Sequence, residues 1–208
     1  MHLHHGVFAV FALGILATTS GIVRAADQPV PGSAYPIRPV RLLVGFSPGG
    51  GSDILARILG KKFTEEWTQQ VVIDNRTGGG GIIASETTAH AEPDGYTLLM
   101  ATSSLAIQPS ITRHLPYDTL KDFTTISLAG SSPYLLLLHP SVEANSVKEL
   151  VDLARSRPGK LNYASAGAGS TLHLSAELFK SMAGVDIVHI PYKGAVAMSD
   201  LLAGQVQM

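Results

Sequence analysis

Cysteine is absent from the 208 residues of this chain, so no disulfide can form within them. The folded state must therefore rest on a hydrophobic core. Aromatic residues are also scarce, at 6% with a single tryptophan. Neither sign of charge predominates, because the chain has 15 Lys and Arg residues and 16 Asp and Glu residues. This balance gives no indication of a basic surface for nucleic acid.

Long apolar runs are absent apart from one stretch near the start, Val7–Ala17. It is too short to cross a bilayer. Small residues follow it, and it ends in Val23-Arg24-Ala25, a pattern typical of a secretory signal peptide over residues 1–25 with cleavage after Ala25. Three histidines stand before this run, where Lys or Arg is usual; we expect them to be removed with the signal rather than to bind metal. The sequence therefore predicts an exported, periplasmic protein.

Glycine is plentiful, and one cluster of it lies between a strand pattern and a helix pattern. The apolar run Val40–Phe46 predicts a buried strand, and Ile54, Leu55, Ile58 and Leu59 follow at helical spacing. The connecting loop, Ser47–Asp53, holds three consecutive glycines. The first N–H groups of a helix have no partner within it, and glycines allow a ligand to approach them closely. The pattern predicts an anion-binding loop.

The same arrangement occurs a second time in the chain. A predicted strand, Leu161–Ser165, leads through the glycines of Ala166–Gly169 to a helix that starts near Ser170. His173 follows closely enough to turn toward the same place. Two such loops predict a small anion that is held from two sides.

Other kinds of site fit these loops less well. The first loop lacks the Lys-Ser/Thr pair of a nucleotide-binding P-loop and the glycine spacing of a dinucleotide fingerprint. Asp53 is expected in the first helical turn or as a support for the loop, since a carboxylate repels an anion. Ser170 is either a helix cap or a ligand contact. Ser170 and His173 together leave a hydrolase as an alternative, although no nucleophile elbow or acidic third member is evident.

Two further clusters allow a ligand-binding or a structural interpretation. Thr102, Ser103 and Ser104 follow a predicted strand, where parallel sheets bind ligands, but they also suit a helix cap. The run Gly78–Gly81 either admits a ligand or relieves crowding at a helix start, and we favour the structural role.

The order of elements predicts an α/β fold with mainly parallel sheets. A domain boundary is expected near Ser131–Pro133, which gives a first lobe over 26–132 and a second over 133–208, with a cleft between them. Expected strands are Val40–Phe46, Val71–Asn75, Thr97–Ala101, Ile126–Ala129, Tyr134–Leu138, Leu161–Ser165 and Asp186–Ile190. Expected helices are Asp53–Glu66, Ile82–Ala91, Val147–Ser156, Thr171–Ala183 and Ala195–Ala203. Gln205–Met208 reads as a strand that is cut as it begins, which suggests a C-terminally truncated chain.

These segments resemble the Bug/TctC family, the extracytoplasmic solute receptors of tripartite tricarboxylate transporters. The matching motifs span most of the chain from Tyr35 onward. They are Arg38-Pro39-Val40-Arg41, Gly45–Asp53, Pro93–Leu99, Pro158–Tyr163, Gly167–Leu174 and His189–Gly194.

The resemblance implies a two-lobed periplasmic-binding-protein fold of the Venus flytrap type, here with an incomplete second lobe. It also implies that both glycine loops grip a carboxylate through backbone N–H groups and ordered waters, and that membrane subunits of a transporter are the partners. The candidate ligand-binding residues are Phe46, Ser47, Gly49, Gly50, Gly51, Ser52, Asp53, Thr102, Ser103, Ala166, Gly167, Gly169, Ser170 and His173. No catalytic residue, metal ligand or cofactor is expected.

Three positions depart from the family pattern, namely Ser47, Thr77 and Glu143, each where proline is usual. Only Ser47 touches the expected site, so the departure concerns which carboxylate is bound rather than the fold. The alternatives to a transport receptor are the hydrolase and a receptor that reports its ligand to a signalling partner.

Overall fold

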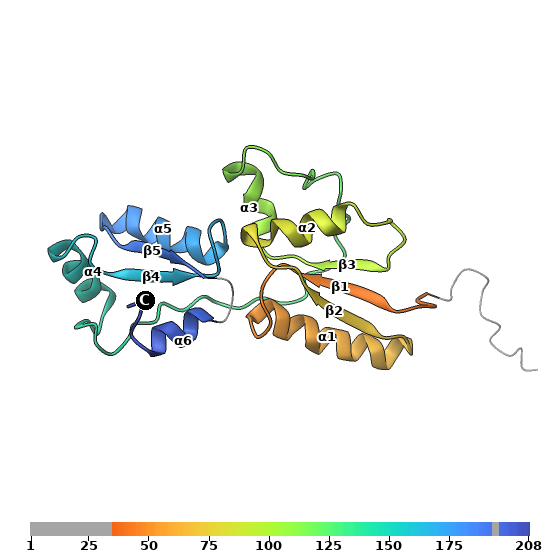
Figure 1. Ribbon diagram of the computed structural model, residues 1–208, viewed down its shortest axis with the longest axis horizontal. Coiled ribbons are helices and arrows are strands. Elements are labelled where there is room, and N and C mark those ends of the chain that lie inside the picture. The colour runs from red at the N-terminus through yellow and green to blue at the C-terminus, as the bar shows by residue number, and fades with distance from the viewer. Residues whose placement is uncertain (1–34, 193–195) are drawn as a thin grey trace, which may run out of the picture. The chain divides into compact units, whose positions relative to one another are not determined.

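The computed structural model describes residues 35–192 and 196–208, and it has an α/β architecture with two separate parallel sheets (Figure 1). The first sheet has the strand order β2-β1-β3, and the second pairs β4 with β5. The strands are β1 (Val40–Val44), β2 (Val71–Asn75), β3 (Thr97–Met100), β4 (Asn162–Ser165) and β5 (Val188–Pro191). The α/β class with parallel sheets that the sequence predicts is thereby confirmed.

The first sheet is built around β1, whose residues are apolar apart from Arg41 and are almost all fully buried. Parallel partners flank it on both sides, with Val40 beside Val71 of β2 and Leu42 beside Leu98 of β3. Helix α1 (Gly51–Trp67) lies on one side of this sheet and α2 (Ile82–Ala89) on the other (Figure 1). Coverage on both faces explains why β1 is continuously apolar rather than alternating.

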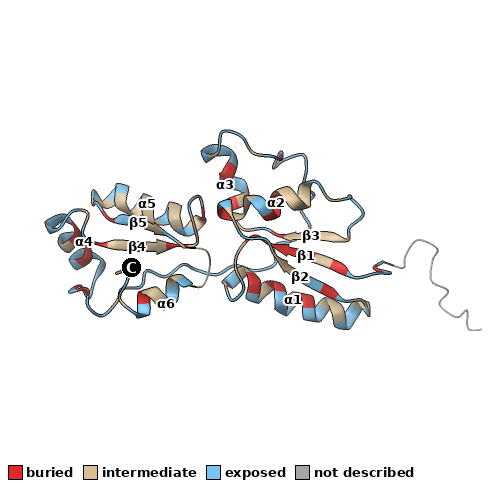
Figure 2. Ribbon diagram, in the orientation of Figure 1, coloured by how far each residue is buried: buried red, intermediate tan, exposed pale blue. Residues whose placement is uncertain are grey.

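The second sheet carries its own core. Helices α4 (Val147–Ser156), α5 (Thr171–Ala183) and α6 (Val196–Leu202) accompany its two strands. Leu150, Tyr163 and Ile187 are central to a buried cluster in which Leu150 and Ile187 are fully inaccessible. In Figure 2 buried positions are concentrated in β1, and others lie in α1 and α4.

Helix α4 begins as the sequence predicts. Ser146 is the N-cap residue, and its side chain accepts a hydrogen bond from the backbone N–H of Glu149. The Glu149 side chain accepts one in return from the backbone of Asn145. These reciprocal bonds satisfy N–H groups that a helix start otherwise leaves unpaired.

The last described residues run beside β4 without being assigned as a strand. The backbone N–H of Ala164 donates to the carbonyl of Met208 at 2.8 Å, and Met208 donates to the carbonyl of Asn162 at 3.1 Å. Val206 and Met208 are buried. Gln205–Met208 therefore makes strand-like hydrogen bonds, although the strand predicted there is not fully formed.

Most predicted elements agree with the structure to within a few residues. Helix α1 starts two residues before its predicted start, at Gly51 rather than Asp53. Helix α3 (Ser104–Ile111), which contains Pro109, is absent from the expected helices, although the helix-cap interpretation of Thr102–Ser104 implies a helix start there; Ser103 is its N-cap residue, without a side-chain cap bond. The expected start of α6 at Ala195 lies outside the described residues, as do the signal peptide with its cleavage site after Ala25 and the N-terminal histidines.

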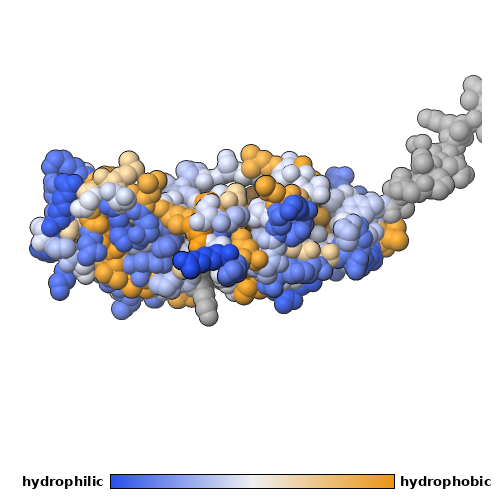
Figure 3. Space-filling model, turned by 90° about the horizontal axis from the view of Figure 1, so that it is seen from above, coloured by the Kyte–Doolittle hydropathy of each residue, from blue (hydrophilic) through white to orange (hydrophobic). Residues whose placement is uncertain are grey.

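Two predicted strands, Ile126–Ala129 and Tyr134–Leu138, are wrong. Both segments are irregular, and Leu128 and Leu135 are more than three-quarters exposed. A strand forms only where a neighbouring strand takes up its backbone groups, and no described residue pairs with these segments as a strand. Apolar side chains reach the surface in several places (Figure 3). Within the described residues, no helix is both long and apolar enough to cross a membrane.

We expect Leu150→Ala to lower the free energy of unfolding by about 2–5 kcal/mol, because it leaves a cavity in a closed core. The matched control is Val147→Ala on the same helix, where the side chain is 60% exposed and the loss should stay below about 1 kcal/mol. Urea unfolding of the full-length protein measures both changes. Equal losses in the two variants would contradict the assignment of Leu150 to the core.

Candidate functional site

The first glycine loop connects the carboxyl end of β1 to α1. Its backbone turns at Gly49, where φ is 82°, a value that strongly favours glycine. Gly50 is the N-cap residue of α1, with φ −75° and ψ 163°, and no side chain caps the helix there. A Cβ on Gly51 would meet no atom within 4 Å. The uncapped helix start thus stands next to open space.

Asp53 supports this loop from beneath. Its side chain is almost completely buried and accepts hydrogen bonds from the backbone N–H of Gly49 and from the Asn75 amide, both at 2.9 Å. Arg57, one turn further along α1, donates two more at 2.9 Å. Asn75 also donates to the carbonyl of Phe46, so the end of β2 is tied to the same loop.

The charge of Asp53 is stabilised by these donors. Hydrogen bonds from Arg57 are the main cause, and they lower the pKa of Asp53 to about 2 against the opposing effect of burial. The carboxylate is engaged on both oxygens and in addition occupies the N–H of Gly49. This geometry supports the expectation that Asp53 orients the loop; it does not support Asp53 as a direct ligand.

The second glycine loop joins β4 to α5. Gly167 and Gly169 both have positive φ, at 110° and 76°. Ser170 is the N-cap residue of α5, and its buried side chain accepts a hydrogen bond from the backbone N–H of His173. The structural interpretation of Ser170 as a helix cap is therefore confirmed.

His173 holds the second loop much as Asp53 holds the first. Its Nδ1 accepts a hydrogen bond from the backbone N–H of Gly169 at 3.2 Å. Its ring stacks on His189 at 4.2 Å between ring centres, and His189 in turn stacks on Tyr163. Burial, with a contribution from His173, lowers the pKa of His189 and favours its neutral form.

This arrangement does not support the hydrolase alternative. The described bonds of Ser170 run to the backbone of His173 and not to its imidazole, whose Nδ1 is engaged with Gly169. A serine nucleophile needs its hydroxyl within reach of a base. Ser165, which does contact a histidine ring at 2.7 Å, is itself buried and bonded to Gly167.

Helix α3 contacts the second loop, a feature that sequence reasoning missed. The hydroxyls of Ser103 and Ser104 lie 3.0 and 3.1 Å from the hydroxyl of Thr171 at the start of α5. The buried Gln108 side chain donates to the carbonyls of Gly79, at 3.1 Å, and Gly169, at 3.4 Å. Because α3 itself was not predicted, no pattern pointed to Gln108.

The run Gly78–Gly81 has a structural role here, as we favoured. All four residues have positive φ, and Gly79–Gly81 form a short 3-10 turn ahead of α2. A Cβ on Gly80 would come within 2.9 Å of the Gln108 amide and 3.1 Å of the Ala168 carbonyl. Only glycine allows this close approach.

The predicted site residues therefore occupy two loops and the start of one helix. Phe46 to Asp53 form the first loop and the start of α1, whereas Ala166 to His173 form the second loop and the start of α5. Ser103 contacts the second group through Thr171. Among the described residues there is no cluster of three metal-ligating side chains.

In each of the two parallel sheets one strand leads through a glycine loop to a helix start, an arrangement common at ligand-binding sites of α/β proteins. Residues 55–208 match the model of the tripartite tricarboxylate transporter family receptor, TctC. The chain belongs to this family.

Individual relatives agree with that assignment. BugT of Bordetella pertussis is 39% identical over 197 residues, which cover 93% of this chain and 59% of BugT. A solved structure of R. palustris Rpa4515 with adipate is 40% identical with a TM-score of 0.80. The match covers 83% of this chain and 58% of the Rpa4515 chain. MatC from Rhodopseudomonas palustris with bound malate is 32% identical with a TM-score of 0.75, over 83% of this chain and 60% of its own. The chain thus spans less than two thirds of the length of these relatives, which are binding proteins and not enzymes.

We predict that Asp53→Asn lowers the free energy of unfolding by about 1–3 kcal/mol at neutral pH, because it breaks a buried, charge-assisted network. The pKa of Asp53 is lower in the folded protein than its ordinary value of 3.8, so its stabilisation is complete above pH 4 and is lost as the pH falls toward 2. The difference between wild type and variant should shrink over that range. Denaturant unfolding at several pH values measures it.

The control for this experiment is Asp152→Asn. Asp152 also forms a pair with a basic residue four positions away, Lys148, but both side chains are more than half exposed. Its loss should stay below about 1 kcal/mol. A gap between wild type and Asp53→Asn that does not change with pH would contradict the role given to the Asp53 charge.

Proposed function

We propose that this chain is the ligand-binding part of a periplasmic solute receptor that captures a small organic carboxylate and delivers it to a tripartite tricarboxylate-type membrane transporter. One observation carries the proposal, namely that two glycine loops each lead directly onto a helix start. Helix starts attract negative charge, and the start of α1 has no side-chain cap that would compete with a ligand.

The relatives support a carboxylate as the ligand. The solved structures of Rpa4515 and MatC hold adipate and malate, both of which are dicarboxylates. In the proposed complex one carboxylate group receives hydrogen bonds from the backbone N–H groups of Gly51–Asp53, and the loop Ala166–Gly169 contacts it through ordered waters. Thr102 and Ser103 supply hydroxyl groups nearby. Recognition through backbone groups tolerates variation in the remainder of the ligand.

The mode of action follows from the same proposal. We propose two lobes, over residues 26–132 and 133–208, that close on the ligand and release it to membrane subunits. The periplasmic location follows from the predicted signal peptide over residues 1–25. No chemical change of the ligand is part of this function.

A thermal-shift screen with the full-length protein tests the proposal. Adipate and malate serve as probes, with aromatic acids and amino acids for comparison, because a ligand that binds the folded state raises the melting temperature. Mass spectrometry of the recovered ligand separates a receptor, which returns it unchanged, from a hydrolase. Co-purification with membrane subunits separates a transport receptor from a signalling one.

We expect Gly51→Val to abolish carboxylate binding in the full-length protein and to leave the fold intact. A side chain at this position meets no atom within 4 Å, so it costs the fold little, but it obstructs the approach to the start of α1. Titration calorimetry with the best ligand from the screen measures the loss.

The matched control is Ser181→Val, which places the same side chain at an exposed position near the end of α5. It should bind as the wild type does. Unchanged affinity in Gly51→Val would contradict the role of the first loop.

A further inference from the structure

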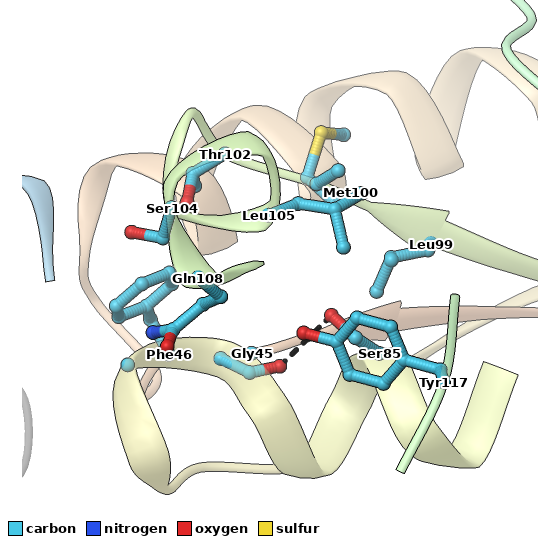
Figure 4. A pocket seen from close by; sticks show the side chains of 13 residues that line it. Gly45, Phe46, Ser85, Leu99, Met100, Thr102, Ser104, Leu105, Gln108 and Tyr117 are labelled. Carbon is cyan, nitrogen blue, oxygen red and sulfur yellow. Dashed lines mark hydrogen bonds between the residues drawn. The ribbon is translucent and has the colours of Figure 1, made fainter. Parts of the chain in front are cut away.

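A small pocket lies next to Phe46, the residue before the first glycine loop, and it is lined by residues of β3, α2 and α3 (Figure 4). Phe46, Gln108 and Ser104 are at one end of it, and Ser85 and Tyr117 are at the other. Phe46 immediately precedes the loop that is proposed to bind the carboxylate. The pocket therefore shares Phe46 and Thr102 with the candidate ligand-binding residues.

Tyr117 is the unusual residue of this pocket. Its side chain is 8% exposed, and its hydroxyl oxygen is fully buried without a hydrogen-bond partner among the described residues. Figure 4 shows this hydroxyl directed into the pocket and next to Ser85. A buried hydroxyl that lacks a partner is costly, so such groups normally have one.

Each neighbouring polar side chain has another hydrogen-bond partner. The Ser85 hydroxyl donates to the carbonyl of Gly81 at 3.0 Å. The Gln108 amide donates to Gly79, and its oxygen accepts from Thr112 at 2.8 Å. Burial raises the pKa of Tyr117 against a smaller opposing effect of the nearby Ser85 hydroxyl, so the phenol keeps its proton and is able to donate as well as accept.

The size and charge of the pocket limit what can pair with this hydroxyl. About 10 Å³ is available at its centre, which is the room that one water-sized group needs. None of the described residues that line the pocket carries a formal charge. A second carboxylate would lack a counter-charge there, whereas an uncharged O–H group fits both limits.

We propose that this pocket binds one uncharged O–H group, which hydrogen-bonds to the Tyr117 hydroxyl. The group is supplied by a hydroxyl of the carboxylate ligand or by a fixed water. This inference rests on the proposed function for the first source only. When the ligand supplies the O–H group, Tyr117 determines whether the receptor prefers hydroxylated acids.

The test compares Tyr117→Phe with wild-type full-length protein in two measurements. The first is the melting temperature without ligand. The second is the affinity for malate and for succinate, which differ by one hydroxyl. Tyr134→Phe is the matched control, since Tyr134 is 55% exposed and lies outside the pocket.

Each source of the O–H group has its own signature. If the ligand supplies it, Tyr117→Phe binds malate about tenfold more weakly and succinate unchanged, and the ligand-free variant melts at a higher temperature because an unpaired buried hydroxyl is gone. If a fixed water supplies it, the ligand-free variant melts at a lower temperature, and any loss of affinity is equal for both acids.

The proposal is overturned if the melting temperature does not fall and malate shows no selective loss. Failure of the proposed function is a separate result, because wild-type protein would then bind neither acid. The ligand-free melting temperature still decides the water source in that case.

Discussion

The first glycine loop depends on the hydrogen bonds that the buried carboxylate of Asp53 accepts. It gathers four donors from three places in the chain, namely the loop itself, the next turn of α1 and the end of β2. A loop rich in glycine loses much conformational entropy when it is ordered, and local bonds must offset that cost. Asp53 supplies them from a buried position. The helix start can then remain without a cap and still be held in one place.

The second loop meets the same requirement with different chemistry. A histidine ring takes the N–H of Gly169, and a stack of three rings from β4, β5 and α5 fixes that histidine. Ser170 caps the helix, so this loop offers fewer open backbone donors than the first. The two loops are therefore unequal. We propose that the first receives the charge of the ligand and that the second positions groups around it.

The sequence predicted the elements that depend on local pattern. Buried strands such as β1 and capped helices such as Val147–Ser156 follow from local residue patterns, and the glycine loops are evident from the local composition. The strand predictions for Ile126–Ala129 and Tyr134–Leu138 failed because an apolar run becomes a strand only beside a pairing strand. No local pattern reveals whether such a strand is present. Gln108 and Tyr117 were missed for a related reason. Their roles depend on which groups surround them in the folded chain. Those surroundings are set by the packing of α3 against segments distant in the sequence.

We propose that negative charge on the ligand, and not its shape alone, is recognised at the start of α1. Titration calorimetry of the full-length protein with adipate and with adipamide tests it most directly, because the two molecules differ little in size but only the first carries carboxylates. The account predicts binding of adipate, or of another carboxylate found in the screen, and no measurable binding of its amide. Equal affinity for acid and amide would contradict it.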